Sequence, residues 1–252
     1  MGDLPIAELN VHRRVAVISQ PMYFPWVGLL EQVRLSDVFV HLDDAQFARG
    51  FFNRVQIKVG DRQTWMTIPL KRHHQRDPIS QIRVDDSTDW RAQHRSQLVN
   101  AYRGAPFLDD VLRIVDDVYA LKTDSLADIS VASVEALVGY FGLADRRVFV
   151  RSSHLECGGR STQRLLAICQ KMGANVYITG EGALRYLNHS LLEDHGVSVY
   201  YMNYEMRQYP QRGSTFTPFV SSLDLVANCG IDGAKYISSN EKYWQDYLRE
   251  RG

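Results

Sequence analysis

The chain alternates short runs of consecutive apolar residues with longer segments in which apolar residues recur every three or four positions. Short, nearly continuous apolar runs are typical of strands that are buried on both faces of a parallel sheet. Apolar residues at three- and four-residue steps predict amphipathic helices. The apolar runs predict strands at 14–19, 38–42, 147–150, 176–179 and 197–202.

The helical pattern fills most of the intervals between these strands. A helix at 27–35 joins the first two strands, and strand–helix–strand units of this kind pair parallel strands through a right-handed crossover. Gly60-Asp61, between 56–59 and 64–70, predicts an antiparallel hairpin, and 79–84 predicts a further short strand. Helices are expected at 89–102, with Asp89 as the N-cap, and then at 106–120, 125–141 and 161–172.

Together these elements predict an α/β fold. We expect a mostly parallel, Rossmann-like sheet with flanking helices, a β-hairpin and an all-helical middle segment. The sequence contains no internal repeat and no linker rich in Pro, Gly or Ser. It therefore predicts a single α/β domain over residues 1–252, with a helical insertion at about 89–142.

The charge balance argues against nucleic acid as a partner. Lys and Arg together number 29, Asp and Glu together number 29, and the formal net charge is zero. Proteins that grip phosphate backbones usually carry a basic excess. One basic cluster does occur, at Lys71, Arg72, His73, His74 and Arg76. The pattern favours a solvated loop for this cluster, and an anion site is the alternative.

Composition also bears on the compartment. No apolar run reaches the roughly 18 residues that a membrane-spanning helix needs. The first fourteen residues lack the apolar core of a secretory signal. Cys157, Cys169 and Cys229 are odd in number, widely spaced and without a CxxC pair, so they indicate neither a disulfide framework nor a zinc site. We expect a cytoplasmic protein, and no metal-ligand set is predicted.

Polar residues follow four of the predicted strands. Gln20 is followed by Tyr23 and Trp26, Asp43-Asp44 by Gln46, and the later ends carry 151–153 and 179–182. Ligands of open parallel sheets bind beyond the carboxyl ends of the strands. Any one of these segments could be a helix cap or a turn, since Asp, Ser and Gly serve there too. Taken together they favour a pocket, with Gln20, Asp43 and Ser153 lining a shared cavity.

Three further positions are candidates for chemistry. Asn53-Arg54 offers a donor fork for carboxylate or phosphate, with a surface ion pair as the alternative. His94 shares a predicted helix face with Trp90 and Tyr102, so it is either a core residue or an acid/base group. The turn at 180–182 could hold an anion on backbone N–H groups. GxGxxG, Walker A, GxSxG and HExxH motifs are absent from the sequence.

Several of these segments resemble the WbqC-like family of bacteria. The similar pieces are, in chain order, SQPMYFPWVGLLEQVRLSDVFVHLDDAQF, NRVQIK, WMTIPL, the DW…H…Y…AP string of 89–106, VRSS, YITGEGALRYL and SSLDLVANCG. The first is long and specific, whereas EMRQYPQRGSTF after Tyr204 matches less well. The residues that the resemblance carries over are Gln20, Pro21, Pro25, Trp26, Gly28, Asp37, Asp43, Gln46, Asn53, Arg54, His94, Tyr102, Ser153, Gly180, Asp224 and Asn228.

The resemblance implies a role beside surface-polysaccharide or specialised-metabolite biosynthesis, and an aminoacyl or glycine transferase acting on sugars has been suggested for the family. The layout of the first strand, turn and helix is also similar to nucleotidyl transferases with an HxGH turn. The histidines of that turn are missing here, because Pro25-Trp26 stands in their place. Nucleotidyl transfer is therefore not implied, although the shape still suits a nucleotide or nucleotide sugar.

The resulting prediction is a transferase that attaches an amino acid, with glycine suggested, or a similar acyl group to an amino or hydroxyl group of a sugar or nucleotide sugar. Its substrates are then a sugar or nucleotide sugar and an amino-acid donor. Asp43 and His94 are the predicted catalytic residues. The predicted substrate-binding residues are Gln20, Tyr23, Trp26, Gln46, Asn53, Arg54, Tyr102, Ser153, Gly180, Glu181 and Asn228.

Two other functions stay open at this point. One is a non-catalytic protein that binds a nucleotide sugar or a partner enzyme. The other is a metal-dependent hydrolase or lyase that uses Asp43 and Asp44. The sequence does not identify a cofactor or the oligomeric state.

Overall fold

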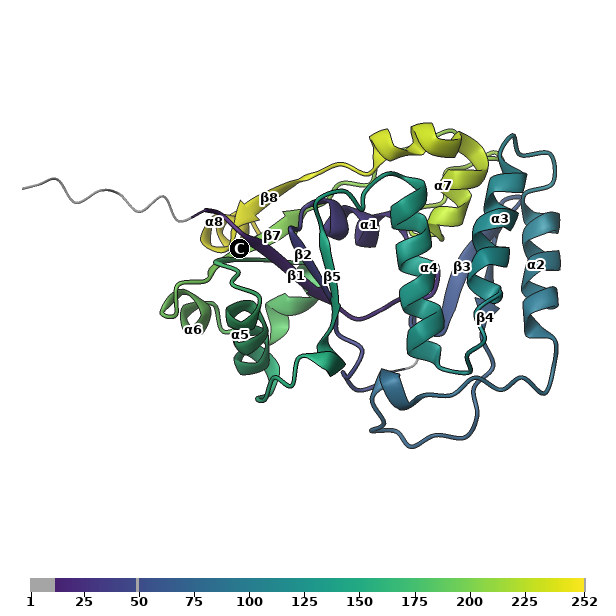
Figure 1. Cartoon of the computed structure of the whole chain (residues 1–252). Coiled ribbons are helices and arrows are strands. Elements are labelled where there is room, and N and C mark those ends of the chain that lie inside the picture. The colour runs from purple at the N-terminus through teal and green to yellow at the C-terminus, as the bar shows by residue number, and fades with distance from the viewer. Residues whose placement is uncertain (1–11, 49, 252) are drawn as a thin grey trace, which may run out of the picture.

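The fold was obtained as a computed structural model that describes residues 12–48 and 50–251. Within that part of the chain a six-stranded sheet has the order β5-β2-β1-β6-β7-β8 (Figure 1). The strands are β1 (Val15–Ser19), β2 (Val38–His41), β5 (Val148–Arg151), β6 (Val176–Thr179), β7 (Ser198–Asn203) and β8 (Asn240–Tyr243). All neighbours pair in parallel except β7 and β8, which are antiparallel. The predicted fold class is thus confirmed.

Strand β1 lies at the centre of the sheet and pairs with β2 on one side and β6 on the other. Its Val15 and Val17 belong to one apolar core, and its Ala16 and Ile18 belong to a second. This alternation follows from the two-residue period of a strand and shows that both faces of the sheet are covered.

Helices α1 (Val27–Arg34) and α5 (Ser161–Lys171) cover opposite faces of this sheet. Leu29 and Leu30 of α1 join the core of Val15, whereas Leu165 and Ile168 of α5 join the core of Ala16. Helix α1 leads from β1 to β2, while α5 leads from β5 back across the sheet to β6. The connections therefore diverge between β1 and β6, which makes that position the topological switch point of the sheet.

A group of helices extends the core of Val15 away from the sheet, around an antiparallel hairpin (Figure 1). Helix α3 contacts α2, α4 and α7, and the hairpin contacts α2 and α7. The hairpin strands are β3 (Arg54–Val59) and β4 (Arg62–Thr67), and the helices are α2 (Trp90–Ala101), α3 (Leu108–Tyr119), α4 (Leu126–Tyr140) and α7 (Ser222–Cys229). As predicted, the Asp89 side chain caps α2 by accepting a hydrogen bond from the Ala92 N–H, at 3.1 Å.

The opposite face of the sheet carries shorter elements. Helices α6 (His189–Glu193) and α8 (Trp244–Arg249) lie beside the outer strands β7 and β8. Short 3₁₀ segments occur at Ile79–Gln81, Ser152–His154, Glu181–Arg185 and Gly230–Tyr236. Among the helices of residues 12–48 and 50–251, none combines the length and apolar character needed to cross a membrane.

The strand expected at 79–84 is wrong. Ile79–Gln81 forms a 3₁₀ turn, in which the amide of Ile82 donates to the Ile79 carbonyl at 3.1 Å. Val84 forms only a single bridge, to Leu70. Apolar residues at 79, 82 and 84 serve the core from a turn here, and short apolar runs do not distinguish this case from a strand.

Candidate functional site

A cavity of about 390 Å³ lies at the carboxyl edge of the sheet, at the switch point between β1 and β6. Ser19 contributes the end of β1, Gly180 follows β6, and Met202 and Tyr204 come from the end of β7. Leu29 and other residues of α1 complete one wall. We call it the switch-point cavity; its lining residues are Ser19, Met22, Trp26, Leu29, Gln32, Gly180, Glu181, Gly182, Met202, Tyr204, Met206 and Phe219.

Three aromatic rings gather on this cavity. The ring of Trp26 meets those of Tyr204 and Phe219 at centroid distances of 5.4 Å each, with interplanar angles of 82° and 63°. Phe219 is 53% exposed although it is a large apolar residue. Its φ of +62° lies in the left-handed region, which a bulky side chain rarely adopts. An exposed ring on a strained backbone is a feature that often marks a ligand contact.

Trp26 also covers the first turn of α1. A Cβ added to Gly28 would lie only 2.1–2.4 Å from three atoms of the indole six-membered ring. Glycine is therefore required at this position so that the ring can rest on the helix. In doubly wound folds the first helix N-terminus commonly holds phosphate groups. Here the indole covers that place, so the cavity presents an aromatic surface rather than a phosphate cradle.

Gln32, which lines the same cavity, has an unsatisfied polar atom. Its Oε1 is buried and has no hydrogen-bond partner among the described residues. Its Nε2 lies close to Gly180, since a Cβ at that glycine would be 3.1 Å away. A buried amide oxygen without a partner costs free energy, and a ligand that donates a hydrogen bond would remove that cost.

Glu31, the neighbour of Gln32, is fully buried but satisfied. Its carboxylate accepts hydrogen bonds from the Arg34 guanidinium at 2.6 and 2.8 Å and from the Ser239 hydroxyl at 2.5 Å. Burial, with a contribution from the Glu31 charge, raises the pKa of Tyr204. Tyr204 therefore presents a neutral hydroxyl at the cavity throughout the physiological pH range.

Asp43 and Asp44 form a closed cluster with the end of β5. The Asp43 carboxylate accepts from the Ser153 N–H at 2.9 Å, the Ser153 hydroxyl at 2.8 Å and the Ser152 hydroxyl at 3.2 Å. Asp44 accepts from the Ser152 hydroxyl at 2.6 Å and pairs with Arg164. Strand β2 ends at His41, and the turn after it brings both carboxylates to Ser152.

His94 lies inside the helical core and not at an open surface. Its Nε2 donates to the Thr67 carbonyl, at 3.2 Å, and its Nδ1 lies 3.0 Å from the Tyr23 hydroxyl and 3.3 Å from the Tyr119 hydroxyl. Burial lowers the pKa of His94 to about 4. The imidazole is therefore neutral near pH 7, and both of its nitrogens are engaged.

Asn228 binds a second buried carboxylate, Asp224; burial raises the pKa of Tyr102, and the charge of Asp224 raises it further. Asp224 is 2% exposed and accepts from Gln211 at 2.7 Å, Tyr209 at 2.9 Å and Asn228 at 3.3 Å. Burial raises the pKa of Asp224. The hydroxyl of Tyr102 is buried with no partner in the described residues. This cluster ties α7 to the loop that precedes it.

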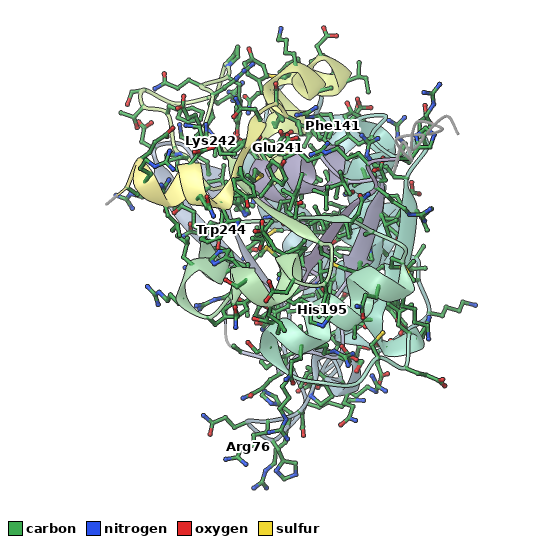
Figure 2. All side chains as sticks on the ribbon, turned by 90° about the vertical axis from the view of Figure 1, so that its left-hand side faces the viewer. Arg76, Phe141, His195, Glu241, Lys242 and Trp244 are labelled. Carbon is green, nitrogen blue, oxygen red and sulfur yellow. The ribbon has the colours of Figure 1, made fainter. Side chains whose placement is uncertain are left out.

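A second and larger cavity, of about 940 Å³, lies along the β3–β4 hairpin. It contains the predicted residues Gln46, Asn53 and Arg54 and part of the basic cluster, namely Lys71, Arg72 and His73. The rest of that cluster does not line it, and Arg76 projects from the body of the molecule (Figure 2). We call it the basic groove; its lining residues are Gln46, Phe47, Ala48, Asn53, Arg54, Thr67, Ile68, Pro69, Leu70, Lys71, Arg72, His73 and Gln75.

The structure thus distributes the predicted site residues over several places. Trp26, Gly180 and Glu181 line the switch-point cavity, and Gln46, Asn53 and Arg54 line the basic groove. Neither cavity is lined by Gln20, Asp43 or Ser153, and the half-buried Gln20 is not brought to the Asp43 cluster by any recorded hydrogen bond. The buried clusters hold the remaining four, Tyr23, His94, Tyr102 and Asn228.

Sequence reasoning missed Gln32, Tyr204 and Phe219. Gln32 occupies a polar position of an amphipathic helix, where glutamine carries no special signal. Tyr204 and Phe219 lie next to the segment that resembles the family least. No cluster of three or more His, Cys, Asp or Glu side chains that could hold a metal ion occurs in residues 12–48 and 50–251.

Comparison with known proteins places the chain in a family. Residues 20–236 match the model of the WbqC-like protein family. The uncharacterized protein Rv1507c of Mycobacterium tuberculosis is 28% identical over 231 residues, which cover 89% of this chain and 97% of that protein. No solved structure matches the chain significantly. Because the family match spans most of the sequence, the chain belongs to the WbqC-like protein family.

Proposed function

We propose that the protein is a transferase that binds a sugar or nucleotide sugar in the switch-point cavity and attaches an amino-acid acyl group to it. The observation that carries this proposal is the position and lining of that cavity. It lies where open α/β sheets bind their ligands, and its walls combine Trp26, Tyr204 and Phe219 with the unpartnered amide of Gln32.

The lining suits a sugar better than a phosphate. Aromatic rings offer large apolar surfaces with specific geometry, against which the C–H face of a sugar ring can lie. The Gln32 Oε1 would accept a hydrogen bond from a sugar hydroxyl or amino group, which ends its isolation. A volume of about 390 Å³ falls within the range of small-molecule sites.

Glu181 is the group on this cavity that would recognise an amino-acid donor. Hydrogen bonds from Arg251, at 2.5 Å, and from the Tyr247 hydroxyl, at 2.9 Å, lower the pKa of its carboxyl group. Glu181 is therefore ionised near pH 7. Both contacts use Oε1, which leaves Oε2 for the ammonium group of the donor.

The catalytic roles of Asp43 and His94 stay predictions. Both side chains are buried, and their oxygen and nitrogen atoms already serve internal hydrogen bonds. Either role requires the local hydrogen bonds to rearrange when substrates bind. The same enclosure favours the second candidate function, in which the protein binds a nucleotide sugar without turnover.

Calorimetric titration with nucleotide sugars and free amino sugars, with and without glycine, tests the proposal. Mass spectrometry then reports whether an amide or ester product forms. Gln32→Ala is expected to weaken sugar binding, and Gln97→Ala, at an exposed position of α2, is the matched control. Binding that depends on Gln32 without product formation would support the binding protein. Binding that ignores Gln32 would refute the assigned site.

A further inference from the structure

The basic groove carries a concentrated positive charge in a protein whose formal net charge is zero. Arg54, Lys71 and Arg72 line it together with His73. None of the described residues that line it is acidic. Interspersed charge is the rule for the rest of the sequence, so this local excess identifies a surface suited to an anion.

Arg54 is the fixed element of the groove. Its guanidinium lies over the Trp65 ring, 4.3 Å from the ring centroid. Its Nε is buried and has no hydrogen-bond partner within the described part of the chain. Stacking holds the planar guanidinium in one orientation, and a guanidinium donates in a fork that matches phosphate oxygens. The surface ion pair considered for this residue is not observed among the described residues.

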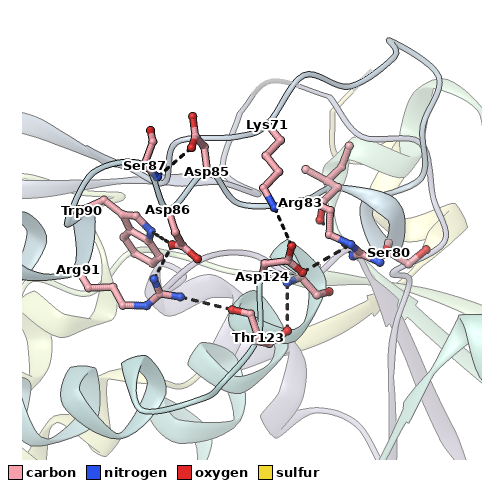
Figure 3. A network of polar contacts seen from close by, with 12 residues as sticks. Lys71, Ser80, Arg83, Asp85, Asp86, Ser87, Trp90, Arg91, Thr123 and Asp124 are labelled. Carbon is pink, nitrogen blue, oxygen red and sulfur yellow. Dashed lines mark hydrogen bonds and ion pairs between the residues drawn. The ribbon is translucent and has the colours of Figure 1, made fainter.

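The other two cations differ in how freely they can respond to a ligand. Lys71 is paired with Asp124, at 3.0 Å, and Asp124 also contacts Arg83, at 3.7 Å (Figure 3). The charge of Lys71 is therefore partly compensated by Asp124, which lies outside the groove. Arg72 is exposed and forms no ion pair with any described residue. Arg54 and Arg72 are thus the two guanidinium groups available to an anion.

An apolar wall adjoins these charges. Pro69 and Leu70 line the same groove and are partly exposed, whereas Phe47 and Ile68 also line it but are almost fully buried. The volume of about 940 Å³ exceeds the need of an inorganic ion and suits a molecule with an organic part. Such a wall beside two guanidinium groups indicates an amphipathic anion.

We propose that the basic groove binds a small organic diphosphate, with its phosphates on Arg54 and Arg72 and its organic part against Pro69 and Leu70. This site is separate from the switch-point cavity, since the two share no lining residue. The proposal therefore does not depend on the transferase function. The proposal also assigns a ligand to the segment around Lys71, for which the sequence pattern alone favours a solvated loop.

The test is calorimetric titration of the full chain with inorganic pyrophosphate and with uridine 5′-diphosphate at low salt. Both are expected to bind saturably, and the organic diphosphate more tightly. Arg54→Gln is expected to weaken both roughly 10- to 100-fold, because charge-assisted hydrogen bonds are lost. Arg72→Gln should weaken both by a smaller factor. Arg62→Gln, an exposed arginine of the same hairpin outside the groove, is the matched control.

Three kinds of result would overturn the proposal. Absence of saturable binding, or equal binding by all three variants, overturns it. Equal affinity for citrate would show that the groove recognises carboxylates. Much tighter binding of a single-stranded oligonucleotide would show a nucleic-acid surface. Should Arg54→Gln unfold, Arg72→Gln still tests the site, because an exposed arginine without an ion pair contributes little to folding.

Discussion

Replacing Gly28 by alanine is expected to lower the free energy of unfolding relative to a glycine-to-alanine change elsewhere, because the Trp26 ring lies against Gly28. Gly28 lies in the first turn of α1, and its Cα faces the indole ring that forms part of the switch-point cavity. Replacing Gly28 by alanine adds one methyl group at that contact. Gly139, which lies in α4 with nothing within 4 Å of the corresponding Cβ position, provides the control.

At Gly139 only helix propensity acts. Alanine is favoured over glycine in a helix by about 1 kcal/mol, so Gly139→Ala is expected to raise the free energy of unfolding by up to that amount. At Gly28 the new methyl carbon would lie 2.1 Å from the nearest indole carbon. That is about 1.4 Å short of the roughly 3.5 Å at which carbon atoms pack. Overpacking of this kind costs about 1–3 kcal/mol. The free energy of unfolding of Gly28→Ala should therefore be lower than that of Gly139→Ala by about 1–3 kcal/mol.

Urea unfolding of both variants gives the two free energies by linear extrapolation. A double-mutant cycle isolates the cause, because the cost of Gly28→Ala should disappear in a Trp26→Ala background where no ring remains to be displaced. If Gly28→Ala stabilises the wild-type protein as much as Gly139→Ala does, the ring does not rest on the helix. The shape inferred for the switch-point cavity is then wrong.

Three further predictions concern single side chains. Phe219→Asn should leave the free energy of unfolding almost unchanged, because relief of about 1–2 kcal/mol of left-handed strain offsets the loss of about 1 kcal/mol of burial. Sugar affinity measured by calorimetry should fall. A large loss of stability would contradict this prediction. His94, with its pKa lowered to about 4, is neutral when folded, so its contribution is complete above pH 6.5 and is lost toward pH 4. Urea midpoints across this interval should fall by the equivalent of about 3 kcal/mol, and a His94→Asn variant should lack that component. Asp43→Asn should lower stability by about 1–3 kcal/mol in thermal unfolding, because asparagine keeps only one acceptor oxygen for the three hydrogen bonds that Ser152 and Ser153 donate; unchanged stability with lost turnover would instead support a catalytic Asp43.

The sequence predicted the parallel strands β1, β2 and β6 well because they are buried on both faces. A run such as Val38–His41 is fully buried, and burial leaves a signal in apolar composition that needs no knowledge of partners. Strand β8 leaves no such signal, since Asn240–Tyr243 is mostly polar and half exposed at the sheet edge. It is a strand because its backbone pairs with β7, and that pairing depends on the tertiary fold.

The candidate site was harder to predict, for a reason visible at Asp43 and Ser153. Residue type indicates that a side chain can bind a ligand, and parallel topology indicates that strand ends converge. Neither indicates whether the converging groups bind one another. Asp43 and Ser153 do meet, but they satisfy each other's hydrogen bonds and line neither the switch-point cavity nor the basic groove. Function therefore has to be sought where the groups remain unsatisfied.

That criterion singles out both cavities, although the Tyr102 hydroxyl in the buried Asp224 cluster is unpaired as well. Among the buried polar atoms without partners in the described chain are the Gln32 Oε1 and the Arg54 Nε, one on each cavity. The exposed and strained Phe219 adds a third cost at the switch-point cavity. Satisfied groups such as Asp43 and His94 contribute to the stability of the fold itself. Unsatisfied groups lower it, and a fold retains such groups where a ligand completes their interactions. The candidate sites of this protein are therefore better located where an unpaired polar atom belongs to a cavity-lining residue than by which reactive residues the chain contains.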